Sequence, residues 1–225
     1  MKRRAGFTLV ELVICIAILA LLAGAALPAV AGYLNSRART TTHAELERLG
    51  AATLEYFRDV RALPGSLAAL ETGTGIANWS GPYMTSSALD AASGLPSAQV
   101  DGWSQPYDLA AASSSRLVLT SRGSDRAAGT SDDIALVVDV VPVRRELSLE
   151  RLRTINQAVR AYNAQYLTSA PLSATWSSAL ARLVATGYLP NDPNLASDGF
   201  GSAFVADPAG LAPVVRFKSS HVAGS

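Results

Sequence analysis

The chain has 225 residues, of which 49% are hydrophobic and 16% charged, and its formal net charge is +1. With a balance this close to neutral, charge alone implies neither nucleic acid nor an acidic surface as a partner. The sole cysteine, Cys15, excludes an intrachain disulfide framework and a cysteine-based metal site within one chain. The length suits one or two small domains.

Residues 7–34 form an apolar run in which the one strongly polar side chain is Glu11. About 20 apolar residues cross a bilayer as a helix, so this run is long enough to span a membrane. Lys2-Arg3-Arg4 precede it, and cations in this position stay on the cytoplasmic side. We therefore expect one membrane-spanning helix, with the C-terminal bulk of the chain on the far side.

A secretory signal peptide is the main alternative for this segment. It would carry basic residues, a short apolar core and a small-residue cleavage site, which Ala29-Val30-Ala31 would provide. The apolar run is long for that role, and a carboxylate at its start is a poor match. A secreted enzyme or binding module behind a signal peptide is therefore the alternative from a different class of function.

The segment GFTLVELVICIAIL, which begins at Gly6, resembles the processing site of type IV pilins and pseudopilins. The resemblance implies that prepilin peptidase cleaves after Gly6, so that residues 1–6 are a leader and Phe7 becomes an N-methylated terminus. It places Glu11 at the mature position where the family has its glutamate. Pro28 falls where the family has a helix-bending proline. Subunits of this family are single-pass proteins of the bacterial inner membrane, with the head in the periplasm.

The resemblance also gives the intramembrane carboxylate a role. An ionised carboxylate at the centre of a bilayer costs roughly 2.5–3.5 kcal/mol, so Glu11 requires a partner. Cleavage would create one, the ammonium group of Phe7. In filaments of this family the glutamate of one subunit pairs with the N-terminus of a neighbour, which would set the axial register. The alternative is a carboxylate at the helix end that reaches the lipid headgroups.

The helical pattern continues beyond the apolar run. Apolar side chains recur at spacings of three and four residues as far as Val60, and Pro64-Gly65 end the pattern. This predicts one helix over residues 7–61, of which 7–34 form the membrane or filament-core part. The remainder is amphipathic and needs a globular partner to cover its apolar stripe.

The predicted partner is a small head over residues 35–141. Short helices are expected at 66–71 and near 86–92. Three strand candidates follow, separated by turn residues: 107–110, 116–121 and 134–141. We therefore predict an α+β fold in which a long N-terminal spine packs on a small antiparallel sheet.

A second unit is predicted over residues 148–225, after a linker at 142–147. Ser148 is a candidate N-cap for a helix with an apolar stripe. A shorter helix opens near Trp176 and a last strand is expected at 214–218. This unit is also interpreted as α+β.

The second unit repeats the order of the first. Each has a long helix, a short helix with a glycine stop, and then Asp-Gly-aromatic before a strand. The two tripeptides are Asp101-Gly102-Trp103 and Asp198-Gly199-Phe200. We interpret the second unit as a degenerate pilin-like duplicate of the head, although so few identities at so long a period also arise by chance.

An acidic loop lies between the second and third strand candidates. Its oxygen-bearing side chains include Ser121, Asp125, Asp132 and Asp133. Calcium takes six to eight oxygen ligands, and carboxylates brought together repel unless a cation neutralises them. The spacing does not match an EF-hand. From these residues alone, the loop is either a calcium site or a solvated turn in which Asp and Ser cap their own backbone.

The head resembles that of the major pseudopilin of type II secretion systems. The matching patterns are Asp-Gly-Trp-x-x-Pro-Tyr, Ser-x-Gly-x-Asp and Gly-Thr-x-Asp-Asp-Ile, and the resemblance covers residues 6–139. It implies a structural calcium ion with these ligands: Asp125, Asp132, Asp133 and Ser121, and the carbonyls of Arg122 and Thr130. Where the family commonly has glycine after its first loop aspartate, this chain has Arg126.

The sequence holds no catalytic constellation. Its two histidines, His43 and His221, have neither a cysteine partner nor a carboxylate pair at ligand spacing. We therefore expect a structural subunit of a periplasmic pseudopilus and not an enzyme. It would polymerise with itself and work with prepilin peptidase, minor pseudopilins and an inner-membrane assembly platform, without nucleic acid. The alternative is a pilin or minor pilin of a surface pilus used in adhesion, motility or DNA uptake.

Overall fold

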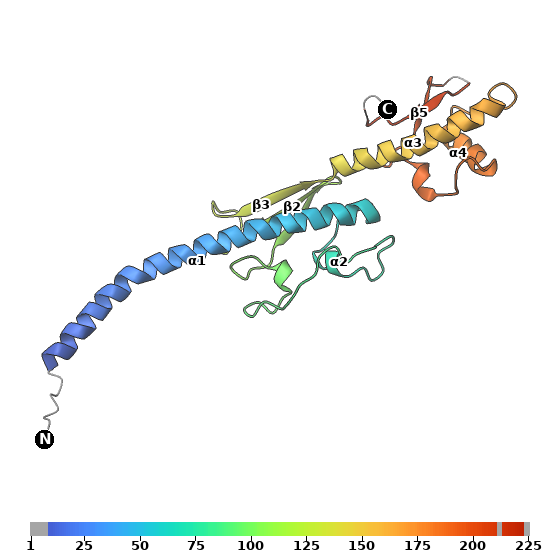
Figure 1. The fold of residues 1–225 in the computed structure, drawn as a ribbon. Helices are drawn as coiled ribbons and strands as arrows, with labels where there is room; N and C mark the ends of the chain where they lie inside the picture. Colours follow the sequence, from blue (N-terminus) through green and yellow to red (C-terminus); the bar gives the residue numbers. More distant parts are fainter. Residues whose placement is uncertain (1–8, 211–212, 223–225) are drawn as a thin grey trace. The chain divides into compact units, whose positions relative to one another are not determined.

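The computed structural model describes residues 9–210 and 213–222 (Figure 1). The predicted cleavage and methylation site, Gly6 and Phe7, lies outside the described residues. The chain divides into two compact units, residues 1–138 and 139–225.

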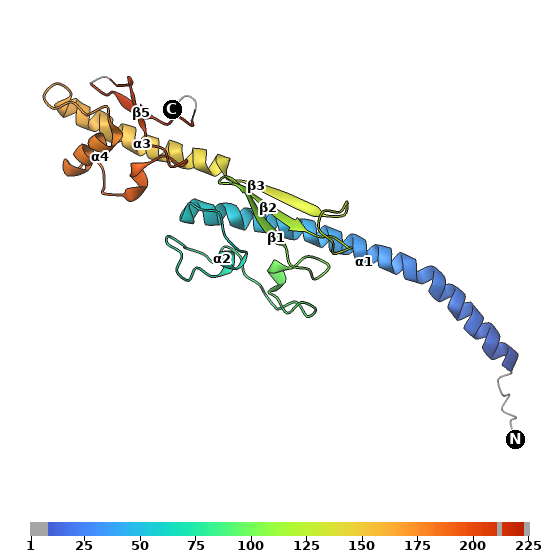
Figure 2. The same ribbon diagram turned by 180° about the vertical axis from the view of Figure 1, so that it is seen from behind.

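The first unit is built on one long helix, α1 (Leu9–Val60), which confirms the predicted spine. Among the described helices, α1 alone is long and apolar enough to cross a membrane, and none of its apolar stretch is buried. Pro28 lies inside the helix, and Figure 2 shows α1 curved through its apolar half. Proline has no backbone N–H to donate to the helix. The apolar half of α1 therefore bends more easily than a helix with uninterrupted hydrogen bonds.

The head of the first unit consists of a short helix and a three-stranded sheet. The elements are α2 (Ala68–Glu71), β1 (Asp108–Ser113), β2 (Arg116–Ser121) and β3 (Ile134–Asp139). The sheet order is β1-β2-β3, and β1 pairs with β2 antiparallel. This confirms the predicted α+β layout of spine and small sheet.

The helix expected near residues 86–92 is absent. The Asp90 carboxylate accepts hydrogen bonds from the backbone N–H groups of Ala92 and Ser93, which folds this stretch into a tight turn. A β-bridge between Leu89 and Pro96 closes the turn. An aspartate that bonds its own following backbone competes directly with helix formation.

The core of the first unit lies between the polar half of α1 and the sheet. The buried α1 residues include Leu46, Leu49, Ala52 and Tyr56, and the buried strand residues include Leu117, Leu119, Ile134 and Val138. The amphipathic stripe predicted for α1 is therefore the face that carries the head.

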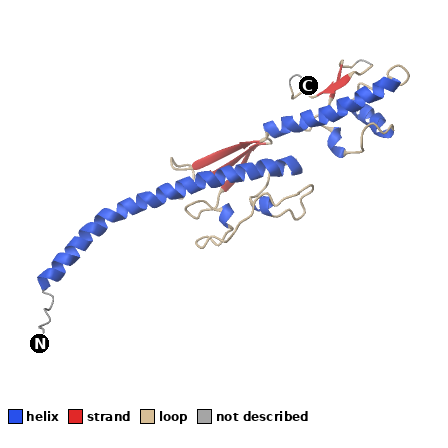
Figure 3. Ribbon diagram, in the orientation of Figure 1, coloured by secondary structure: helices blue, strands red, loops and turns tan. Residues whose placement is uncertain are grey.

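The second unit, residues 139–225, is again α+β (Figure 3). Its elements are α3 (Val141–Tyr166), α4 (Trp176–Ala185), a 3₁₀ turn (Pro193–Ala196), β4 (Val205–Asp207) and β5 (Arg216–Lys218). Strands β4 and β5 pair antiparallel. Its core is aromatic: the Trp176 ring packs edge-on against Phe204 and Phe217, with centroid distances of 5.3 and 4.8 Å.

The predicted linker at 142–147 is wrong, because these residues form the first turns of α3. Pro142 is accommodated in the first turn, where its missing N–H has no helical partner to lose. Val143 and Leu147 are buried, so this stretch belongs to the packed helix. Ser148, predicted as the N-cap, lies buried inside α3 instead.

A side chain of α3 forms hydrogen bonds with the backbone at one edge of strand β5. In the first unit, β2 has β1 on one side and β3 on the other. Among the described residues of the second unit, β5 pairs with β4 alone. The Phe217 N–H of β5 donates to Asn156 Oδ1 at 2.7 Å, and Asn156 Nδ2 donates to the Phe217 carbonyl at 2.9 Å. One side-chain amide on α3 thus satisfies both backbone groups of a strand residue.

We expect Asn156→Leu to expose the Phe217 amide to solvent exchange. The substitution keeps the branched shape of the side chain but removes both hydrogen bonds. The loss of local protection is about 1–3 kcal/mol, which corresponds to roughly 5- to 150-fold faster exchange. Hydrogen exchange of the full chain in detergent micelles measures this at Phe217. Gln157→Leu, at an exposed position of the same helix, is the matched control. Unchanged protection in the Asn156 variant would contradict the assignment.

Candidate functional site

Glu11, the predicted assembly residue, lies in the first turn of α1 with an exposed side chain. A carboxylate at this end of a helix is favoured by the helix dipole. Every Leu, Ile and Val from Leu9 to Leu34 is exposed in the single chain. A continuous apolar surface of this length requires a lipid environment or the helices of neighbouring subunits.

The head is attached to α1 through a turn centred on the buried side chain of Asp101. Asp101 Oδ1 accepts hydrogen bonds of 2.9 Å from the N–H groups of Trp103 and Gln105. Asp101 Oδ2 accepts a hydrogen bond of 2.5 Å from the hydroxyl of Ser121, at the end of β2. One carboxylate therefore holds both the turn and the strand end.

Gly102 brings this turn onto the spine. Its N–H donates to the Thr42 hydroxyl at 3.0 Å, and that hydroxyl donates to the Ala38 carbonyl one turn earlier in α1 at 2.9 Å. A Cβ at Gly102 would overlap the backbone of Ala38. Only glycine permits this close approach of loop to helix.

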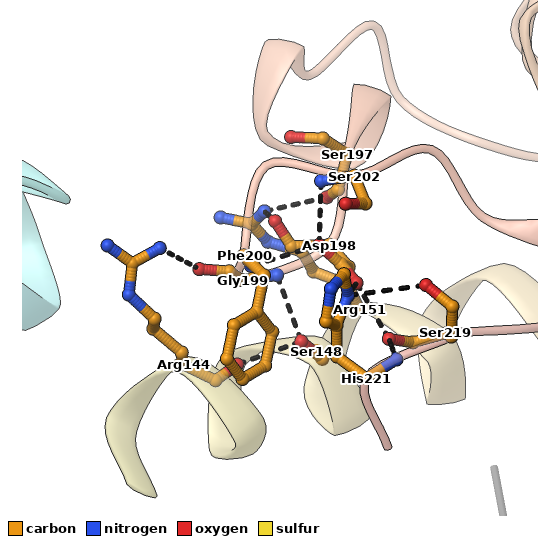
Figure 4. A network of polar contacts seen from close by, with 11 residues as sticks. Arg144, Ser148, Arg151, Ser197, Asp198, Gly199, Phe200, Ser202, Ser219 and His221 are labelled. Carbon is orange, nitrogen blue, oxygen red and sulfur yellow. Dashed lines mark hydrogen bonds and ion pairs between the residues drawn. The ribbon is translucent and has the colours of Figure 1, made fainter. Parts of the chain in front are cut away.

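Asp198 forms the same arrangement in the second unit (Figure 4). Its Oδ1 accepts hydrogen bonds of 2.9 Å from the N–H groups of Phe200 and Ser202, and its Oδ2 accepts one of 2.7 Å from the Ser219 hydroxyl. His221 Nδ1 lies 3.1 Å from the same Oδ2. Burial of Asp198 opposes ionisation, but these hydrogen bonds together bring its pKa below the usual value.

Gly199 repeats the contact of Gly102. Its N–H donates to the Ser148 hydroxyl at 2.9 Å, and that hydroxyl donates to the Arg144 carbonyl at 2.8 Å. A Cβ at Gly199 would overlap that carbonyl. Ser148 is therefore the counterpart of Thr42.

Ser121 lies apart from the other predicted calcium ligands. It is fully buried, and its hydroxyl donates to Asp101. Residues 117, 119 and 121 are all buried along β2, since alternate strand residues face the same side. Strand alternation is a sequence signal that would have assigned Ser121 to the core.

Of the three carboxylates predicted to bind calcium, those of Asp132 and Asp133 lie close to the same hydroxyl group. The Thr130 hydroxyl lies 2.7 Å from Asp132 Oδ1 and 3.4 Å from Asp133 Oδ1. Asp132 Oδ2 accepts from the hydroxyl and N–H of Ser124 and from the N–H of Asp125. These hydrogen bonds hold the pKa of Asp132 well below its usual range, and those from the Thr130 and Ser124 hydroxyls have the largest effect. Asp132 is therefore ionised at neutral pH.

The third carboxylate, Asp125, accepts instead from the Ala127 N–H at 2.8 Å. Throughout the described part of the chain, no three His, Cys, Asp or Glu side chains lie close enough together to hold a metal ion. Asp125, Asp132 and Asp133 thus do not gather into one group in this arrangement. Arg126 has φ of 62°, in the left-handed region that favours glycine, which accounts for the glycine that the family commonly has there.

Two protein-family models match the chain. Residues 1–27 match the prokaryotic N-terminal methylation motif, and residues 29–140 match the type II secretion system protein G family. The chain belongs to the type II secretion pseudopilin family. No match was found among the curated proteins or the solved structures.

The protein G match ends at residue 140, directly before α3, so the second unit of this pseudopilin lies outside both matches from α3 onward. The long apolar helix and the methylation motif suit a pilin-like protein anchored in the inner membrane. Sequence reasoning found both Asp-Gly-aromatic turns of the pseudopilin but missed their helix partners, Thr42 and Ser148. A hydroxyl in mid-helix has no distinctive pattern, although both residues stand on the apolar side of their helices.

We expect Gly102→Ala and Gly199→Ala each to loosen their own unit of the pseudopilin. The added methyl group meets helix backbone, and the glycine N–H loses its hydroxyl acceptor, which together cost about 2–4 kcal/mol. Hydrogen exchange resolved by peptide would show loss of protection in residues 1–138 for the first variant and in 139–225 for the second. Gly65→Ala is the control, because a Cβ there meets nothing within 4 Å. Wild-type protection in either turn variant would count against the assignment.

Proposed function

We propose that this pseudopilin is a structural subunit of a periplasmic pseudopilus in a type II secretion system. Prepilin peptidase cleaves it after Gly6 and methylates Phe7, and the subunit polymerises through the apolar half of α1. Its head faces the periplasm. Minor pseudopilins and the inner-membrane assembly platform are its partners, and the protein is not an enzyme.

The observation that carries this proposal is the match of residues 29–140 to the protein G family, directly after the methylation motif. The match favours a pseudopilus over a surface pilus. The exposed apolar surface of α1 supports polymerisation, because a subunit withdrawn from lipid requires neighbouring helices to cover that surface. In such a bundle the Glu11 carboxylate would pair with the Phe7 ammonium group of a neighbour.

Glu11→Gln is expected to abolish filament formation while leaving membrane insertion intact. Glutamine preserves the shape of the side chain but cannot neutralise an ammonium group in a low-dielectric filament core. The measurement is the amount of sheared filament in cells that contain the peptidase and the assembly platform. Glu47→Gln, at an exposed position in the polar half of α1, is the control. If the Glu11 variant polymerises as well as wild type, the pairing mechanism is wrong.

We also propose that the loop over residues 122–133 binds calcium in the folded subunit. Support comes from its chemistry: the loop supplies carboxylate oxygens from Asp125, Asp132 and Asp133, which are ligands that calcium prefers. Asp132 and Asp133 share the Thr130 hydroxyl. Binding would require the Asp125 carboxylate to leave the Ala127 N–H, and it would not involve Ser121.

The double variant Asp132→Ala/Asp133→Ala tests the calcium proposal. Calcium stabilises the folded state that binds it by mass action, so it should raise the melting temperature of wild type and not that of the variant. Thermal melts of the full chain in detergent, with calcium or with chelator, provide the measurement. Absence of a calcium-dependent shift in wild type would remove the metal assignment.

We further propose that residues 139–225 are a second pseudopilin head derived from the first by duplication. Support comes from buried helix positions separated by one constant number of residues. The pairs are Leu46 and Leu152, Leu49 and Ile155, Ala52 and Ala158, Thr53 and Val159, and Tyr56 and Tyr162. Thr42 and Ser148, the hydroxyls that bind the two glycine turns, have the same separation.

Strand register supports the same conclusion. Asp108 pairs with Thr120 in the first unit and Val205 with Lys218 in the second. Asp108 and Val205 follow their aspartates, Asp101 and Asp198, at the same separation. Thr120 and Lys218 each directly precede the serine that binds that aspartate. Asn156 has the helix position of Gly50, where a Cβ would lie 2.9 Å from Leu136 of β3. The glycine thus makes room for a third strand. The asparagine satisfies the strand edge in the second unit, whose described residues form a sheet of two strands.

A further inference from the structure

The indole ring of Trp103 lies beside the residue at which α1 changes from apolar to polar. Trp103 Nε1 donates to Asn35 Oδ1 at 2.9 Å. Asn35 is the first polar residue after the apolar run, and the preceding Tyr33 is 65% exposed. This contact ties the head to one fixed level of the spine.

A groove of about 640 Å³ opens at this level. It is lined by side chains of α1, including Ala31, Leu34 and Arg37, and by Trp103 of the head. Leu34 is 57% exposed, so the groove continues the uncovered apolar surface of α1 without a break. Its apolar wall and adjacent arginine match the upper acyl chain and the phosphate of a phospholipid.

The length of the apolar run places this level at the membrane surface. Residues 9–34 rise by about 39 Å along a helix, whereas a hydrocarbon core is about 30 Å thick and about 40–45 Å with headgroups. The end of the run therefore reaches the headgroup layer on the side away from Lys2-Arg3-Arg4. Tryptophan and tyrosine favour this layer, because it accommodates both their apolar rings and their polar atoms.

We propose that Trp103 and the groove beside it bind the phospholipid surface, so that the head of the unassembled subunit rests on the bilayer at a fixed height. The inference depends on α1 crossing the membrane, as in the proposed function. Trp103 and Tyr33 lie among the headgroups, and Arg37 binds a lipid phosphate. The contact is lost when the subunit leaves the bilayer for the filament.

The test is fluorescence quenching of the full chain in vesicles of phosphatidylethanolamine and phosphatidylglycerol, brominated on the acyl chain near the headgroup. We expect part of the tryptophan emission of wild type to be quenched. That part should disappear in Trp103→Phe and persist in Trp79→Phe. Trp79 is a suitable control because its neighbour Ser80 bonds Asp59, about 36 Å further along α1 from Asn35. Trp176 is present in all three proteins.

Co-flotation with the vesicles separates failure of this inference from failure of the membrane anchor. If the protein floats with the vesicles but wild type is not quenched, the head does not contact the bilayer through Trp103. Quenching that survives in Trp103→Phe would equally overturn the proposal. If the protein does not float at all, the anchor itself is wrong, and this inference is rejected with it.

Discussion

A single unbroken helix, α1, must satisfy two different surroundings, and the rest of the first unit follows from that constraint. Its first half exposes only apolar side chains apart from Glu11, so it requires lipid or other helices. Its second half buries a stripe that includes Leu46, Leu49 and Tyr56 against a small sheet. Because both halves belong to one continuous rod, the position of the head on the second half sets its distance from the apolar half.

The head is held on α1 by a buried network of hydrogen bonds as well as by apolar packing. A buried aspartate gathers two backbone N–H groups and a serine hydroxyl, and the following glycine N–H binds a hydroxyl of the helix. The same set of bonds occurs at Asp101 and at Asp198. A buried polar group without a hydrogen-bond partner destabilises the folded state. Because this network forms only when turn, strand and helix meet in one geometry, it specifies that geometry in both units.

Much of this architecture was predictable from periodicity. The three-and-four spacing predicted α1 nearly to the residue, and the turn residues between the strand candidates delimited β2 and β3. Three features were not predictable, for local reasons. Pro142 suggested a linker, but proline is accommodated in a first helical turn. Strand β4 is too short for an alternation signal, and Asp90 turns its own backbone away from a helix. In the candidate calcium loop, residue chemistry grouped Ser121 with the aspartates, whereas strand alternation turns it to the core.

The family was predictable because one short motif at the N-terminus is specific to it. A glycine, an aromatic residue and a glutamate in fixed register at the start of an apolar helix match the N-terminal methylation motif. The proposed function explains the glutamate by a positive terminus that proteolysis would create. Mass spectrometry of the N-terminal peptide of the mature protein tests this claim most directly. The account predicts a peptide that begins at Phe7 and carries an N-methyl group. A mature chain that begins at Met1, or after Ala31, would contradict it.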